Sequence, residues 1–321
     1  MKTRTFLQAA ALGAAFAFAP AGWAQPYPAK PVKFVVPFPA GSATDLAARV
    51  IANALQEPLG QSVVVDNKPG AGGSIAAMEV VRAAPDGYTL LFSSNSAMAS
   101  NVALLKNMPY APRKDLAPVA AVGDNMLVLM VRVDHPAKNI REFVEYARQR
   151  PGKLSAGYGS SSSQICVAVL NKLGGLSAEA IPYKGIPLAV NDVIGGTLDF
   201  TFVDLGNAIA QAKGGRMRAL GITSLKRTAL EPDWPALAEI MPGFDVTAWF
   251  AIAGPTKLPR EVVDRLNAAV TKALTQDEVK ARLAGIGVQP MAMGPAELQT
   301  FVEAEVTKWV RLAREANIEP Q

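Results

Sequence analysis

The feature that most constrains this chain is the alternation of short apolar runs with helical patterns over most of its length. Runs rich in β-branched and aromatic residues predict strands, among them Val32–Pro37, Thr89–Ser93 and Asp199–Val203. Apolar residues at a spacing of three to four between such runs predict helices, for example Asp45–Leu55 and Ile140–Arg150. This order is typical of sheets covered by helices. The sequence therefore predicts an α/β fold.

The remaining elements continue this alternation and then give way to helices alone. Further strands are predicted at Val63–Val65, Leu127–Val131, Leu154–Gly157, Ala219–Thr223 and Trp249–Ala253, and further helices at Ile75–Ala83, Ile165–Leu173 and Leu188–Ile194. Near the C-terminus, an apolar face runs from Val262 to Leu274, and Thr275 with Glu278 forms the pattern of a capping box for a new helix. A last long helix is predicted from about Pro295 to Ala316.

The length of 321 residues indicates two lobes rather than one. Because no long flexible linker interrupts the pattern, we expect the chain to cross between the lobes through ordered strands near Ala121–Asn125 and Asp245–Trp249. The predicted first lobe is built from residues 25–123 plus 247–321, and the second from residues 124–246. The sheets of the two lobes are expected to be mixed and flanked by helices, with a ligand cleft between the lobes.

The first residues have the pattern of a secretory signal. Lys2 and Arg4 precede an uncharged run from Thr5 to Pro20, and small residues follow up to Ala24. An uncleaved membrane anchor is the alternative, but the run is shorter than the roughly 20 apolar residues that a spanning helix needs. We therefore expect residues 1–24 to be a signal peptide that is cleaved after Ala24, and the mature chain to be periplasmic and not embedded in the membrane.

The charge of the mature chain is mild. Removal of Lys2 and Arg4 leaves 30 basic residues against 27 acidic ones, a formal net charge of +3. No block of like charges offers the clustered basic face that nucleic acid requires, so no nucleic-acid partner is expected. The only cysteine, Cys166, cannot form an internal disulfide and is predicted to be a small buried hydrophobe.

Four predicted strand-to-helix loops could bind a ligand, namely Pro37–Asp45, Ser93–Ser96, Gly157–Gln164 and Val203–Asn207. In open α/β sheets, ligands lie beyond the carboxyl ends of strands, where helices begin. The loops share small residues and hydroxyls, and the two charges among them are negative. Facing helix N-termini can hold an anion without arginine. The predicted ligand-binding residues are Phe38, Ala40, Gly41, Ser42, Thr44, Ser93, Ser94, Asn95, Gly159, Ser160, Ser161, Ser162, Ser163 and Asp204.

Several of these polar residues also fit a purely structural role. Ser42 and Ser74, taken alone, are better explained as helix N-caps. Four consecutive serines at Ser160–Ser163 exceed what one cap requires, which favours binding. Asp204 has two open explanations: it accepts a hydrogen bond from the ligand, or it caps the helix that follows. Asp45 is interpreted as a charge that stabilises the start of its helix.

Enzyme motifs are absent from the sequence. The one histidine, His135, precedes a proline in a predicted turn, which is a poor place for a catalytic base. Gly70–Ile75 begins like a dinucleotide fingerprint but ends in isoleucine instead of Gly or Ala. We therefore expect no catalytic residue, no cofactor and no metal. The alternatives are a secreted serine-dependent hydrolase and the effector-sensing part of a transcription regulator, which would need a helix-turn-helix where the signal stands.

Short fragments along nearly the whole mature chain carry a family resemblance. They include Tyr27–Pro31, Phe34–Gly41, Val64–Gly73, Pro85–Leu91, Pro182–Gly185, Gly195–Asp199 and Arg218–Ser224. In this order and at this spacing the chain resembles the Bug family, the substrate-binding proteins of tripartite tricarboxylate transporters. The resemblance implies a type II periplasmic-binding-protein fold of Venus flytrap type. It also implies a monomer that passes its ligand to a cognate membrane permease.

The resemblance implies a ligand as well. A small organic carboxylate would be held by N–H groups, hydroxyls and water from the loop at Phe38–Thr44 and from the serine-rich loop. Di- and tricarboxylates, aromatic acids and amino acids all remain candidates. Asp204 matches the acidic position that the family has after a strand of the second lobe. The chain departs from the family at Gln164, where a histidine is usual, and at Cys166, within a stretch that is usually small and acidic.

Overall fold

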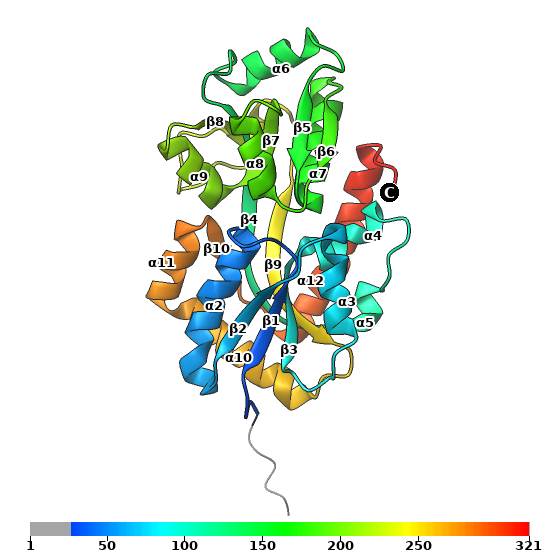
Figure 1. Ribbon diagram of the computed structural model, residues 1–321, viewed down its shortest axis with the longest axis vertical. Helices are drawn as coiled ribbons and strands as arrows, with labels where there is room; N and C mark the ends of the chain where they lie inside the picture. The colour runs from blue at the N-terminus through cyan, green and yellow to red at the C-terminus, as the bar shows by residue number, and fades with distance from the viewer. Residues whose placement is uncertain (1–26, 321) are drawn as a thin grey trace, which may run out of the picture.

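The computed structural model describes residues 27–320, so the predicted signal peptide lies outside the described residues. The strands of this part form one mixed sheet in the order β2-β1-β3-β9-β4-β7-β5-β6, and β8 and β10 also pair with β4. Helices cover the sheet on both sides (Figure 1). This arrangement confirms the predicted α/β class. Neighbouring strands are parallel toward both ends of the sheet and antiparallel around β9 and β4.

The lower half of the molecule in Figure 1, here called the lower body, combines the first and last parts of the chain. Its strands are β1 (Val32–Val36), β2 (Val63–Asn67), β3 (Thr89–Ser94) and β10 (Val288–Pro290). Its helices are α2 (Ala43–Leu59), α3 (Ser74–Val81), α4 (Asn101–Leu104), α5 (Pro112–Asp115), α10 (Arg260–Thr275), α11 (Asp277–Gly285) and α12 (Pro295–Glu315), with the short turns η1 (Ala71–Gly73) and η2 (Ser96–Ser100).

The upper half in Figure 1, here called the upper body, consists of the middle of the chain. Its strands are β5 (Ser155–Tyr158), β6 (Glu179–Pro182), β7 (Phe200–Asp204) and β8 (Met217–Ile222), and its helices are α6 (Ile140–Arg148), α7 (Ser161–Gly174), α8 (Ile186–Ile194), α9 (Leu205–Lys213) and the turn η3 (Leu237–Glu239). Two long antiparallel strands, β4 (Leu116–Arg132) and β9 (Thr247–Pro255), run from one body toward the other.

Packing is continuous along these two strands. The lower-body core includes Phe34 and Ile51, and a second cluster of buried side chains extends from Leu91 through Leu129 to Phe200. Burial of each such side chain contributes about 1.5–3 kcal/mol. The bodies are therefore joined by packed strands rather than by a tether.

A buried carboxylate fixes the last helix on β9. Glu305 of α12 is 8% exposed and accepts hydrogen bonds from the indole N–H groups of Trp249, at 2.7 Å, and Trp309, at 2.8 Å. Since a buried carboxylate must be paired, the Trp249 donor on β9 holds α12 against the sheet, while Trp309 satisfies Glu305 from within the helix.

The structure confirms the predicted strands and helices, with three corrections. The strand predicted at Leu127–Val131 is the end of the much longer β4. The short strands β6 and β10 were absent from the sequence pattern, because each contains a proline and a polar residue and forms no apolar run. Thr275 does not cap α11: it is the last residue of α10, and its hydroxyl donates to the carbonyl of Lys272. Within residues 27–320, no helix has the length and apolarity needed to cross a membrane.

Candidate ligand-binding site

A small cavity lies where the two bodies meet. Its volume is about 20 Å³, which is room for about one water molecule. The lining comes from both bodies and from both connecting strands: Phe38, Ser42, Ala43, Thr44, Ser94, Leu127, Gly159, Ser160, Ser162, Ile186, Asp204, Ala248 and Phe250. Among these residues, Asp204 is the one with a charged side chain.

Four helices begin at this cavity. Ser42 and Ser160 are the N-cap residues of α2 and α7, Ile186 is the first residue of α8, and Asp204 is in the N-cap position of α9. A helix N-terminus presents unpaired N–H groups and about half a positive charge. Four helix N-termini at one cavity can together bind an anion without a cationic side chain.

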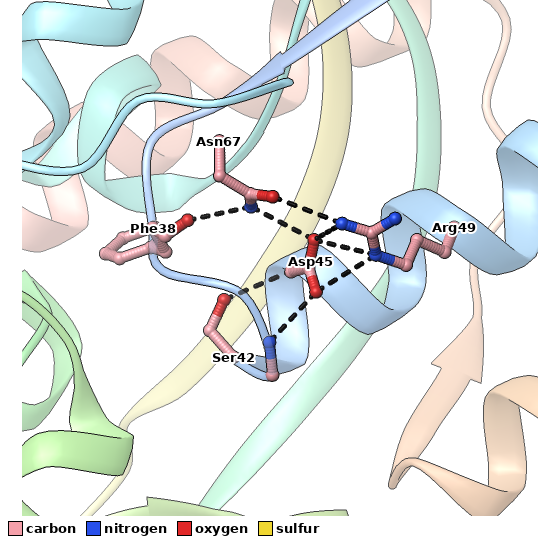
Figure 2. Close-up of polar contacts among 6 residues, drawn as sticks. Phe38, Ser42, Asp45, Arg49 and Asn67 are labelled. Atoms are coloured by element: carbon pink, nitrogen blue, oxygen red, sulfur yellow. Dashed lines mark hydrogen bonds and ion pairs between the residues drawn. The ribbon is translucent and has the colours of Figure 1, made fainter. Parts of the chain in front are cut away.

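The first loop (Pro37–Asp45) is held by a network within the lower body (Figure 2). Asp45, 2% exposed, accepts hydrogen bonds from the Gly41 N–H at 2.9 Å and from the side chains of Arg49 and Asn67, each at 3.0 Å. Asn67 also donates to the carbonyl of Phe38 at 2.9 Å. The network fixes the loop before any ligand arrives.

The Ser42 side chain completes this loop. Its Oγ accepts from the backbone N–H of Asp45 at 3.3 Å, which confirms the prediction that Ser42 is an N-cap. Ser42 also lines the cavity. Gly41 has a φ of +81°, a conformation that favours glycine and that lets its N–H turn back toward Asp45. The first loop thus combines local capping with ligand access.

The serine turn (Ser160–Ser163) is the beginning of α7 rather than part of an open loop. Ser160 and Ser163 form a reciprocal capping box, and the Ser163 hydroxyl also accepts from the N–H of Gly159. This corrects the sequence reading, in which the helix begins only at Ile165. Two of the four serines are therefore used in capping.

The other two serines bond across to the lower body. The Ser161 hydroxyl contacts the hydroxyls of Ser96, at 2.7 Å, and of Ser100 in η2. The Ser162 hydroxyl donates to Oδ1 of Asn95 at 3.1 Å. These bonds link α7 with η2, and so the upper body with the lower one.

Asp204 is 9% exposed, and its Oδ1 accepts from the side-chain N–H of Asn125 on β4 at 2.9 Å. It occupies the N-cap position of α9, but its side chain makes no capping hydrogen bond. Burial raises the pKa of this carboxyl from 3.8 to about 6, against the opposing effects of its own backbone N–H and of Asn125. Of the two explanations that the sequence left open, capping is the one that the geometry disfavours.

A larger cavity of about 400 Å³ adjoins the small one and shares Phe38, Gly159 and Ser160 with it. Its other lining residues are Pro37, Gly70, Ala71, Gly72, Gly73, Asn101, Leu104, Leu105, Tyr158, Ser161, Gln164, Pro182, Tyr183 and Lys184. Lys184 is the one charged side chain along it. Together the two cavities offer a narrow inner end that contains the Asp204 carboxyl and a wider outer end.

The structure brings most of the predicted binding residues to these cavities. Phe38, Ser42, Thr44, Ser94, Gly159, Ser160, Ser162 and Asp204 line the small cavity, and Ser161 lines the larger one. Five predicted residues line neither: Ala40 and Gly41 are exposed, and Ser93, Asn95 and Ser163 are fully buried. Asn95 and Ser163 instead support the lining residues through hydrogen bonds.

The sequence prediction missed the apolar and glycine-rich parts of the lining. The sequence pattern of Gly70–Gly73 indicates an incomplete dinucleotide motif and part of a family fragment, but not a binding segment. The positive φ values of Gly70, Gly72 and Gly73 curve this segment along the larger cavity. Ile186 and Phe250 gave no signal, since an apolar residue at the cavity has the same pattern as one in the core. Ser74, which was predicted as an N-cap, is instead the first residue of α3, and its buried hydroxyl has no partner.

The structure offers no support for a serine hydrolase. His135 lines neither cavity, and its Nδ1 accepts from the backbone N–H of Ala137. Cys166 is fully buried, as predicted, and burial raises the pKa of its thiol. No cluster of three or more His, Cys, Asp or Glu residues that could hold a metal occurs in residues 27–320.

Comparison with known proteins identifies the architecture. Residues 47–318 match the model of a family described as the tripartite tricarboxylate transporter family receptor. Protein BugT of Bordetella pertussis is 35% identical over 296 residues, which cover 91% of each chain. A Rhodopseudomonas palustris protein solved with adipate is 33% identical with a TM-score of 0.89 over 92% of this chain and all of that one. MatC of Rhodopseudomonas palustris, solved with bound malate, is 32% identical with a TM-score of 0.83 over 89% and 99%.

Proposed function

This chain belongs to the tripartite tricarboxylate transporter family of receptors, and on that premise we propose that it captures a small organic carboxylate for such a transporter. The proposal covers a binding function rather than catalysis, in keeping with a receptor family. Its substrate class is that of the two similar proteins solved with adipate and malate.

The observation that carries the proposal is the convergence of four helix N-termini on one small cavity. N–H groups and hydroxyls at such ends donate to an anion, and their partial charges favour it. A carboxylate supplies four lone-pair positions for these donors. The neighbouring cavity of about 400 Å³ provides room for the rest of a small acid.

The proposed ligand-binding residues are the cavity-lining ones, with the hydroxyls of Ser42, Thr44 and Ser160 as donors. Ser94 and Ser162 would donate to the ligand in place of their acceptors in this structure, Ser96 and Asn95. Ala40, Gly41, Ser93, Asn95 and Ser163 belong to the proposed site as support for its loops. Gln164, where the family usually has histidine, lines the larger cavity and would contact the distal part of the ligand.

We further propose that the two bodies are hinged lobes, with residues 25–123 plus 247–321 in one and 124–246 in the other. Only β4 and β9 need to bend for the lobes to separate. A cavity of about 20 Å³ is too small for an organic acid, so the ligand must enter while the lobes are apart. The bonds of Ser161 and Ser162 to η2 belong to the closed form.

Export completes the proposal. The signal pattern at residues 1–24 and the family membership support a periplasmic location, where the monomeric receptor would deliver its ligand to a membrane permease. Mass spectrometry of the protein secreted to the periplasm tests the cleavage after Ala24. A mature N-terminus at Gln25 is expected, and retention of the complete chain in the membrane would contradict it.

A thermal-shift screen of the mature protein tests the function directly. The panel contains adipate, L-malate, citrate, benzoate, nicotinate and L-glutamate, with adipamide as the uncharged partner of adipate. A ligand present at about a hundred times its dissociation constant stabilises the folded state by about 2.7 kcal/mol. Stabilisation by at least one acid but not by adipamide is expected, and indifference to the whole panel would refute the proposal.

Variants of the lining hydroxyls test the site. Ser162→Ala and Ser94→Ala remove hydroxyls from the small cavity, whereas Ser62→Ala removes an exposed one on the loop before β2. Loss of one hydrogen bond to a charged ligand should weaken binding by about 1.5–3 kcal/mol, or about tenfold to a hundredfold. Calorimetry should find Ser62→Ala unchanged. Equal affinities for all three variants would contradict the proposed binding site.

A further inference from the structure

The small cavity contains one carboxyl group and no cation. Asp204 is the charged residue among its lining, and the remaining lining atoms are apolar, hydroxyl or backbone. If the proposed carboxylate ligand enters this space, its own charge comes close to that of Asp204. Two carboxylates in one desolvated site cannot both remain ionised without cationic compensation.

The elements around Asp204 bring no compensating charge. On β4, Asn125 is neutral, and the adjacent Asp124 lies on the opposite face of the strand. On α9 the nearest charged residue is Lys213, at the far end of the helix. The lining residues of α2, α7, α8 and β9 are uncharged.

The charged groups nearby on other elements are already committed or lie outside the small cavity. Asp45 of α2 is paired with Arg49 and Asn67. Lys184 lines the larger cavity and not the small one. The segment between α11 and β10 that approaches Gly206 does so with the backbone of Ile286 and Gly287. The helix N-termini attract both anions alike and do not remove their mutual repulsion.

Asp204 is also built to accept a proton. Oδ1 has Asn125 as its donor, while Oδ2 has no hydrogen-bond partner among the described residues. The raised pKa of about 6 means that the closed site already disfavours the ionised form. A carboxyl group in this position can donate to a ligand oxygen as soon as it is protonated.

We propose that Asp204 takes up one proton from solvent when a carboxylate ligand binds, so that ligand and protein share a hydrogen-bonded carboxyl pair. The proton goes to a carboxylate oxygen of Asp204, which then donates to the ionised ligand. No bond other than this O–H is formed. The inference rests on the proposed function and adds a proton to its binding reaction.

Titration calorimetry of the mature protein with adipate measures this proton. Repeating the titration at pH 7.5 in phosphate and in Tris, buffers with different ionisation heats, gives the number of protons taken up. We expect close to one proton per adipate, and an affinity that falls about tenfold for each pH unit between pH 7 and pH 8.

Asp204→Asn mimics the protonated carboxyl with an amide of similar shape. This variant should take up no proton, bind adipate with an affinity independent of pH, and bind it at least about tenfold more tightly than the unmodified protein at pH 8. Asp124→Asn is the matched control, because burial raises the pKa of Asp124 too although it faces away from the cavity. Its proton count should equal that of the unmodified protein.

The outcomes separate this inference from the function on which it rests. Adipate binding with no proton uptake overturns the inference and leaves the proposed function intact. Asp204→Asn that binds at least tenfold more weakly at every pH also overturns it, since Asp204 would then accept from a ligand hydroxyl or ammonium. If Asp204→Asn does not fold, the proton count of the unmodified protein decides. If no acid of the thermal-shift panel binds, both proposals fall together, and if an acid other than adipate binds, the same titrations are made with that acid.

Discussion

The first loop and the serine turn line the same small cavity from opposite bodies, but different bonds hold them. Asp45 ties the first loop to Gly41, Arg49 and Asn67, all within the lower body. In the serine turn, Ser160 and Ser163 cap each other, while Ser161 and Ser162 bond to η2 across the junction. The hydrogen bonds of the first loop thus lie within its own body, whereas half of the serine turn bonds to the other body.

This difference assigns separate physical tasks to the two sides. Bonds within one body persist whether the bodies are together or apart, so they contribute to folding stability and keep their side of the proposed site in place. In the proposed hinge motion, bonds between the bodies exist only in the closed arrangement and therefore change the equilibrium between open and closed forms. Changes in the first loop should alter unfolding, and changes in the cross-body bonds should alter affinity.

The largest expected effect is that of Asp45→Ala. The carboxylate is 2% exposed, and its loss removes the acceptor of one Asn67 amide N–H, of the Gly41 N–H and of the Arg49 Nε–H. Urea denaturation should give an unfolding free energy lower by about 3 kcal/mol. Asp264→Ala removes an exposed carboxylate that faces Arg260 on α10 and should change it by less than about 0.5 kcal/mol. Similar losses in both variants would mean that the network does not stabilise the loop.

Gly185→Ala should come next, with an effect on affinity instead. Gly185 precedes α8 with a φ of −178°, extended backbone that alanine adopts freely. Its added Cβ would lie 2.6 Å from Cδ of Pro39 in the first loop. Overpacking of about 1–3 kcal/mol would fall on the closed form alone, so calorimetry should show binding weakened by about tenfold or more.

The control for this variant is Gly294→Ala. Its Cβ would meet nothing within 4 Å, and the φ of Gly294 is −67°, so neither closure nor backbone strain should change. The unfolding free energy of both ligand-free variants should stay within about 0.5 kcal/mol of the unmodified protein. If Gly185→Ala loses folding stability and keeps its affinity, the contact between Gly185 and Pro39 does not report closure.

The two sides of the cavity were also predicted from the sequence with unequal success. In the first loop, the N-cap Ser42 was predicted correctly, because it stands just before the apolar face of a helix, a pattern with a local cause. The serine turn was placed in a loop, since the helical period becomes visible only from Ile165 onward. Capping by Ser160 and Ser163 carries no periodicity, and bonds from Ser161 to η2 depend on a contact between segments some 60 residues apart.

The fold was easier to predict than the lining. Alternating strands and helices are recorded in local periodicity, and nine of the fourteen predicted binding residues line one of the two cavities. Asp204 was identified from its place at a strand end, but the sequence could not decide between capping and binding. The bond from Asn125, a residue distant in the sequence, was not predictable from local patterns. Apolar lining residues such as Ile186 could not be found, because no pattern distinguishes the wall of a cavity from a core.

Asp204 lies at the junction of the two sides, and its effect on stability depends on pH. Its folded pKa of about 6 is above its ordinary value of 3.8. The folded state therefore holds the proton more tightly, and the resulting stabilisation is complete below the lower value and lost as the pH rises through the higher one. For protein in the closed arrangement this loss should amount to about 1.3 kcal/mol between about pH 5 and pH 7.5, and it should shrink as the open form, in which Asp204 is hydrated, becomes more populated.

Urea denaturation gives the unfolding free energy of the unmodified protein and of Asp204→Asn at both pH values. The contribution of Asp204 is the change, between the two pH values, in the difference between these free energies. The variant should gain on the unmodified protein as the pH rises. A difference that stays constant would mean that Asp204 is hydrated in the free protein, as it would be if the bodies were mainly apart.

The smallest and most selective effect is expected from a pair of serines two positions apart. Ser161→Ala removes the contacts with Ser96 and Ser100 but no capping bond, so the closed form should lose about 1 kcal/mol and affinity should fall about fivefold. Ser163→Ala removes half of the capping box, and its unfolding free energy should fall by about 1 kcal/mol with affinity unchanged. Calorimetry measures the affinity of each variant, and urea denaturation measures its unfolding free energy. The reverse pattern, with Ser161 affecting unfolding and Ser163 affecting binding, would show that the division between the two sides is wrong, because cross-body bonds would then be present in every form of the protein.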